Sequence, residues 1–250
     1  MREKLDIGQT LRRVFQFYGQ QFGLLVPAAL IVFLPVAIIN GAIGQGERIT
    51  AGAILLTLVS AAVSFVGGFW YQGMVVEAVR DMIDGVRDYS LGQLVRSVTP
   101  VLGALIVAGI LGGIGIAVGF LLLFVPGLVL LTWWALLAPV IVVERAGVGA
   151  AFGRSRALVR GNGWQVFGVI VLLAILQTVV SAFFGALVSG YSESPFAAAL
   201  AGLVGSALVA PLTALAASTM YFELRRMRAE SDPVEPRTDL SGPADLSGPG

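Results

Sequence analysis

The chain of 250 residues contains no cysteine and no histidine. This excludes disulfides, thiol nucleophiles, zinc sites of the Cys/His type, haem ligation through histidine and a histidine general base. We find no pattern of catalytic, cofactor-binding or metal-ligating residues. We therefore expect a protein that is not an enzyme and that uses no cofactor and no metal.

Charge is also scarce. Asp, Glu, Lys and Arg make up 12% of the chain, hydrophobic residues make up 57%, and the mean hydropathy is +0.88. A soluble domain carries about 25% charged residues, so this chain cannot cover its surface with polar groups. The net charge of +1 argues against nucleic acid as a partner. Together these values predict an integral membrane protein.

Long stretches without charge predict the membrane spans. A helix needs about 20 apolar residues to cross the hydrocarbon core. The longest uncharged stretch, 97–143, suits two helices separated by a turn at Val125-Pro126-Gly127. The stretches are continuously apolar rather than alternating, which favours helices over a membrane barrel. Six transmembrane helices are predicted, near 22–43, 51–76, 101–123, 127–143, 164–187 and 196–222.

The distribution of positive charge predicts the orientation. All of the sixteen Lys and Arg residues except Arg48 lie in the N-terminal segment, in the segments 77–100 and 144–163, or after the last span. Positively charged loops stay in the cytoplasm, so we expect both termini there. The strong preference for Arg over Lys is typical of GC-rich bacterial genomes, and we expect a multi-pass protein of the bacterial inner membrane.

An internal repeat precedes the spans. Residues 6–14 (DIGQTLRRV) and 90–98 (SLGQLVRSV) share four residues at equivalent positions, and a weaker third copy begins at Gly147. Each copy combines an apolar stripe with an arginine-bearing face, as in helices that lie in the membrane interface. The equivalent residues are Gly8 and Gly92, Gln9 and Gln93, Arg12 and Arg96, Val14 and Val98, with Gly149 and Phe152 at the positions of Gly8 and Leu11 in the third copy.

The predicted fold is therefore all-α and integral to the membrane. Six transmembrane helices form three hairpins, each preceded by an amphipathic cytoplasmic interfacial helix near 6–20, 90–99 or 147–160. This membrane domain covers 1–228, and the Pro-, Gly-, Asp- and Ser-rich segment 229–250 is expected to be a disordered cytoplasmic tail.

Two sets of residues are candidates for contacts. Arginines on the interfacial helices are expected to bind anionic lipid, although they could instead serve only to set the topology. Small residues spaced along the spans are expected to pack helices closely, within one bundle or between two copies of the chain. The first set is Arg12, Arg13, Arg96, Arg154, Arg156 and Arg160, and the second is Gly109, Gly113, Gly185, Gly202 and Ser206.

Three stretches of the chain resemble the membrane domain that is fused to some bacterial glycerophosphoryl diester phosphodiesterases, and related uncharacterised six-span proteins. They are LDIGQTLRRVFQFY (5–18), APVIVVER (138–145) and RSRALVRGNGWQVF (154–167). The resemblance implies a membrane domain alone. The phosphodiesterase domain of that family is a separate barrel with histidine and metal-binding carboxylates, which this chain lacks, so no phosphodiesterase activity is expected.

Three functions remain open from the sequence. The leading one is a non-catalytic scaffold or accessory subunit linked to lipid or envelope metabolism, with lipids and a membrane protein or second copy as partners. The second is a transporter of a neutral or amphiphilic solute, which requires Asn40, Gln72 and Gln177 to converge on a cavity. The third is a lipid-modifying enzyme that uses Glu77, Glu144 or the aspartate cluster of Asp81, Asp84 and Asp88, and it requires carboxylates to converge on one cytoplasmic pocket. We expect Glu144 to serve in interface pairing instead.

Overall fold

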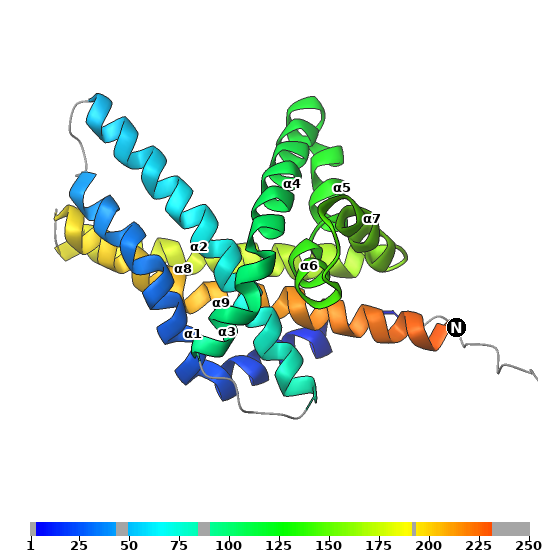
Figure 1. Cartoon of the computed structure of the whole chain (residues 1–250). Helices are drawn as coiled ribbons and strands as arrows, with labels where there is room; N and C mark the ends of the chain where they lie inside the picture. Colours follow the sequence, from blue (N-terminus) through cyan, green and yellow to red (C-terminus); the bar gives the residue numbers. More distant parts are fainter. Residues whose placement is uncertain (1–3, 44–49, 85–90, 192–193, 232–250) are drawn as a thin grey trace, which may run out of the picture.

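A computed structural model describes residues 4–43, 50–84, 91–191 and 194–231, and these residues are almost entirely helical (Figure 1). The elements are α1 (Ile7–Ile43), α2 (Ala51–Asp84), α3 (Leu91–Val98), η1 (Thr99–Val101), α4 (Leu102–Leu122), α5 (Phe124–Trp133), α6 (Leu137–Glu144), α7 (Val148–Val159), α8 (Gly163–Tyr191) and α9 (Pro195–Ser231). Helix α9 continues three residues into the segment predicted as the tail, and the rest of that segment lies outside the described residues.

Among the described residues, six helical stretches are long and apolar enough to cross a membrane, in the order predicted from the sequence. Many of their apolar side chains are fully accessible: Leu121 is 86% exposed and Ile31 is 64% exposed. A surface of this kind is stable in lipid rather than in water. The six stretches are Ile7–Ile43, Ala51–Ile83, Gly92–Leu122, Phe124–Glu144, Gly163–Val188 and Pro195–Glu230.

The predicted interfacial segments do not all form separate helices. Segment 6–20 is the beginning of α1, which runs without interruption into the first apolar stretch, and α3 is joined to α4 through η1. Gly19 and Gly23 lie inside α1 and do not end it, because one glycine costs a helix only about 1 kcal/mol. Figure 1 shows instead a bend in α1. The helix contains Pro27 and Pro35, and each proline removes a backbone donor.

Only the third segment forms a separate helix, α7, and it packs against its neighbours. Its apolar face is buried at Ala151, Ser155 and Leu158. The burial follows the repeat, because equivalent positions of all three copies are 0–2% exposed. These are Thr10, Leu94 and Ala151 at one position, and Val14, Val98 and Ser155 four residues later.

The core lies toward one end of the molecule, where α2, α6 and α9 contact one another. Tyr71, Val75, Ile141 and Leu215 are at most 2% exposed there. The pairs α1–α2, α4–α5 and α8–α9 diverge from this core (Figure 1). We call this end the basic end, because it carries the charged residues of 4–13, 144–163 and 221–231, and the opposite helix ends the far end.

The fourth apolar stretch is broken between α5 and α6. Pro139 lacks the N–H that would bond the carbonyl group of residue 135, and it stands in the first turn of α6, where proline is tolerated. The buried hydroxyl of Ser155 bridges the break: it donates to the carbonyl oxygen of Trp133 (2.7 Å) and accepts from the N–H of Leu136 (3.3 Å). Helix α7 thus supplies hydrogen bonds that the broken helix cannot make for itself.

We predict that Ser155→Ala lowers the free energy of unfolding by about 1–3 kcal/mol, because it leaves a buried donor and a buried acceptor unpaired. Thermal unfolding in detergent, followed by tryptophan fluorescence, measures the change. The control is Thr178→Ala, which removes an exposed hydroxyl that bonds only within its own helix. Equal melting temperatures for the two variants would contradict the bridging role.

Candidate functional site

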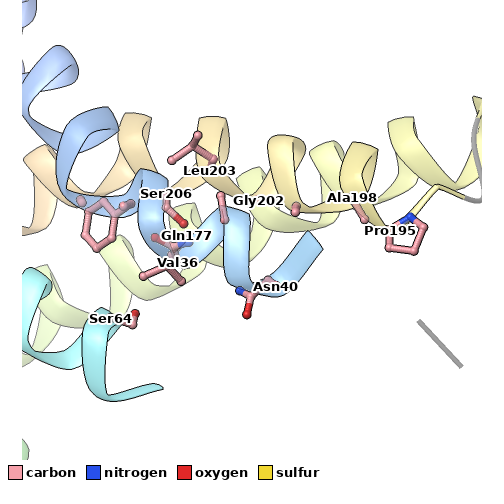
Figure 2. Close-up of a pocket in the computed structure, with 13 residues that line it drawn as sticks. Val36, Asn40, Ser64, Gln177, Pro195, Ala198, Gly202, Leu203 and Ser206 are labelled. Atoms are coloured by element: carbon pink, nitrogen blue, oxygen red, sulfur yellow. The ribbon is translucent and has the colours of Figure 1, made fainter. Parts of the chain in front are cut away.

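A cavity of about 580 Å³ lies between α1, α2, α8 and α9 (Figure 2). Small and apolar residues form most of its lining. Four neutral polar side chains also face it, one from each helix: Asn40, Ser64, Gln177 and Ser206. The described lining contains no charged residue.

The cavity begins near the far end and reaches the middle of the helices. Pro195 is the first residue of α9, and Ala210 lies about 22 Å further along the same helix at 1.5 Å per residue. Asn40 stands close to the last residue of α1, whereas Gln177 occupies the middle of α8. Polar groups are therefore present both at the mouth of the cavity and deep inside it.

A row of small residues on α9 forms one wall of the cavity. Ala198, Gly202, Ser206 and Ala210 recur every four residues and therefore share a helix face (Figure 2). We expected Gly202 and Ser206 to pack against another helix. A Cβ added at Gly202 would meet nothing within 4 Å, so here the small side chains leave a space open.

The other glycines predicted to pack helices closely fall into two groups, those whose added Cβ would meet a neighbour and those whose added Cβ would not. At Gly109 an added Cβ would collide with the ring of Phe69, so this glycine does allow a close contact, whereas at Gly113 and Gly185 it would meet no atom within 4 Å. The closest approach of two backbones that we identify lies further along α4, where a Cβ on Gly119 would be 3.0 Å from the Cα of Gly127. Gly109 and Gly113 are four residues apart and share one face of α4, so spacing alone did not show which of the two meets a neighbour.

Hydrogen bonds orient the two amides of the cavity. The Ser60 hydroxyl donates to Oδ1 of Asn40 (2.7 Å), and Nε2 of Gln177 donates to the hydroxyl of Ser181 (3.0 Å). In the part of the chain that the structure describes, Nδ2 of Asn40 and Oε1 of Gln177 have no protein partner. The site thus offers one free amide donor and one free amide acceptor.

The structure brings together only part of the polar set predicted from the sequence. Asn40 and Gln177 line the cavity, but Gln72 does not. Gln72 lies about 12 Å from Ser64 along α2, toward the basic end. The sequence analysis missed Ser64, for which we see no sequence signal, and assigned Ser206 to packing rather than to a polar lining.

At the basic end, two arginines at equivalent positions of the repeat hold two glutamates. Arg13 contacts Glu223 at 2.7 Å, and Glu223 also accepts from the hydroxyl of Thr10 (2.8 Å). Arg154 contacts both carboxylate oxygens of Glu144 at 3.0 and 3.1 Å. Each pair therefore ties one copy of the repeat to the end of a core helix, α9 in the first case and α6 in the second.

In the second copy of the repeat, Ser97 stands at the position of Arg13 and Arg154. The arginine that contacts a glutamate there is Arg145, from outside the repeat. Arg145 donates to the backbone oxygen of Ser97 (3.2 Å) and to the carboxylate of Glu77 (3.1 Å). The carboxylate of Glu77 is 5% exposed and also lies 3.8 Å from Arg80. Glu77 and Glu144 are thus each engaged by a different arginine.

The six arginines predicted to contact lipid have different environments. Arg13 and Arg154 form the ion pairs just described, and Arg156 lies over the ring of Trp133, 4.1 Å from its centroid. The side chains of the remaining three are exposed and give the basic end an open positive surface. They are Arg12, Arg96 and Arg160.

Six apolar helices of spanning length, with their apolar side chains turned outward, define a multi-pass helical membrane protein. The family described as Domain of unknown function (DUF7847) matches residues 89–224, more than half of the chain, and the chain belongs to this family. The match covers α3 to α8 and most of α9 but not α1 or α2, and it does not name the phosphodiesterase membrane domain, so that resemblance stays a prediction. No curated protein and no solved structure matches the chain.

We predict that Arg13→Gln and Arg154→Gln each lower the free energy of unfolding by about 1–3 kcal/mol, between the values typical of exposed and of buried ion pairs. The thermal unfolding assay described above measures the loss. Arg12→Gln is the matched control, because its exposed side chain precedes Arg13 directly on the same helix. A loss for Arg12→Gln as large as that for Arg13→Gln would show that general charge, not the contact with Glu223, stabilises this end.

Proposed function

We propose that the protein is a non-catalytic accessory protein of lipid or envelope metabolism, and that it acts by binding an amphiphilic molecule in the cavity between α1, α2, α8 and α9. The observation that carries the proposal is a cavity with four neutral polar side chains in its lining, surrounded by apolar, outward-facing helix surfaces. Its volume of about 580 Å³ lies within the usual range of small-molecule sites, about 300–1,000 Å³.

The surroundings of the cavity favour a ligand that comes from the bilayer. Asn40 and Gly202 in its lining are exposed, so the cavity is open. The adjacent surface is apolar: Ile38 is 56% exposed and Phe196 is 57% exposed. An amphiphile satisfies both environments, because its head can bond the amides while its chain stays in the lipid.

The filled core favours binding over passage through the protein. Toward the basic end, Tyr71, Val75 and Leu215 are packed at no more than 2% exposure. A route across the protein would require these side chains to separate and the nearby ion pairs to open. The alternative from the sequence is transport of a neutral or amphiphilic solute. The cavity supports this alternative, whereas the tightly packed core does not.

We also propose that the protein lies in the bacterial inner membrane with its basic end in the cytoplasm and its spans arranged as three hairpins. The concentration of positive charge at one end supports this orientation. The cavity then faces the outer half of the bilayer, and a bound amphiphile belongs to the outer leaflet.

The proposal is tested by the lipids that co-purify with the full chain in mild detergent, identified by mass spectrometry. We expect Asn40→Leu combined with Gln177→Leu, and separately Gly202→Leu, to lower the amount of a specifically retained lipid by about tenfold, the effect of roughly 1.4 kcal/mol of binding free energy. Gln72→Leu is the control, because it removes a span amide outside the cavity. Equal lipid retention by all variants would contradict the proposal.

A second proposal concerns the exposed arginines. We propose that Arg12, Arg96 and Arg160 contact anionic headgroups of the cytoplasmic leaflet, since an arginine near such a surface contributes about 1 kcal/mol. Replacing all three with Gln is expected to lower co-purified phosphatidylglycerol or cardiolipin several-fold at moderate salt, while the melting temperature stays unchanged. Unchanged retention, with topology preserved, would mean that these charges serve only as topological signals.

A further inference from the structure

The polar groups of the cavity restrict the kind of head that it can hold. Asn40 offers an amide donor, Gln177 offers an amide acceptor, and the hydroxyls of Ser64 and Ser206 can do both. A head that only accepts hydrogen bonds would leave the oxygen of Gln177 unpaired, and a head that only donates would leave the amide of Asn40 unpaired. A hydroxyl group donates and accepts, and so it matches the mixed set.

The charge distribution adds a second restriction. Along α2, Ser64 lies about 20 Å from Glu77, and along α9, Ala210 lies about 20 Å from Glu223. Helix α8 carries no charged residue at all. Among the described residues, a phosphate seated beside Gln177 would therefore find no compensating charge nearby in a medium of low dielectric constant, which is far less favourable than a seated neutral hydroxyl.

The position of the polar groups along the helices shows how far inside the cavity the head of the ligand must lie. Ser206 lies about 16 Å along α9 from Pro195, well below the mouth of the cavity. At Gly202, one turn before Ser206 on α9, an added Cβ would meet nothing within 4 Å, so the row of small residues leaves space open there. A head that bonds Gln177 or Ser206 has to leave the aqueous interface, and the loss of water is small for a hydroxyl and large for an ion.

We infer that the cavity selects membrane amphiphiles with an uncharged, hydroxyl-bearing head and rejects those with a phosphate head. This inference rests on the proposed function, because it names the class of ligand for the same cavity.

Photoactivatable lipids with identical acyl chains test the selectivity. The full chain is reconstituted in phosphatidylcholine vesicles with a trace of a diacylglycerol probe, a phosphatidate probe or a phosphatidylethanolamine probe, and the labelled peptides are mapped by mass spectrometry. We expect the diacylglycerol probe to label the lining of α8 and α9 more than the other two by about tenfold or more, given the cost of an unpaired buried charge. Unlabelled diacylglycerol should compete, Asn40→Leu with Gln177→Leu should abolish labelling, and Gln72→Leu should not.

Other outcomes separate the two claims. Equal, competable labelling by all three probes, or labelling by a phosphate-bearing probe alone, overturns the inference about the head while the proposed function stands. No competable labelling of the cavity by any probe overturns both. In addition, Ser206→Lys places a cation in the open cavity and should raise phosphatidate labelling relative to diacylglycerol. An unchanged ratio in this variant would show that charge does not decide the selectivity.

Discussion

The contact of Arg13 with Glu223 joins the first helix of the chain to the last, and the cavity depends on that union. Helices α1 and α9 pack antiparallel: Thr10 and Arg13 meet Glu223 at the basic end, while Gly41 approaches Phe196 at the far end. The backbone N–H of Leu5 also bonds the side chain of Asn162, which ties the same segment to the turn before α8. With the two helices fixed at one end, the residues facing each other along their length are determined.

The sequence predicted the spans because burial in lipid is a property of each segment by itself. A run of about 20 apolar residues is sufficient evidence, whatever the rest of the chain does. The contacts of the arginines are different in kind. From the sequence alone, Arg13 is only a cation on a polar helix face, because its partner Glu223 lies 210 residues away. The repeat carried part of this information, since Arg13 and Arg154 occupy the same position in two copies and both proved to be ion-paired.

The row of small residues on α9 shows a limit of prediction from the sequence. A spacing of four indicates that one face of the helix is smooth, but whether that face meets a helix or an open space depends on neighbours from α1, α2 and α8. Near Gly109 a phenylalanine ring fills the space, and near Gly202 nothing does. Two of the three intramembrane amides were correctly grouped, because Asn40 and Gln177 line the same cavity from different helices, whereas Gln72 belongs to the other half of α2.

The cavity takes its walls from both ends of the chain, and this has a thermodynamic consequence. A molecule seated there contacts α1 and α2 on one side and α8 and α9 on the other, so it acts as a reversible cross-link between segments that are far apart in sequence. Anything that binds the folded state alone stabilises it in proportion to the logarithm of its concentration. With a membrane lipid as the ligand proposed here, the lipid composition of the membrane would determine how firmly the first and last helices described above stay together.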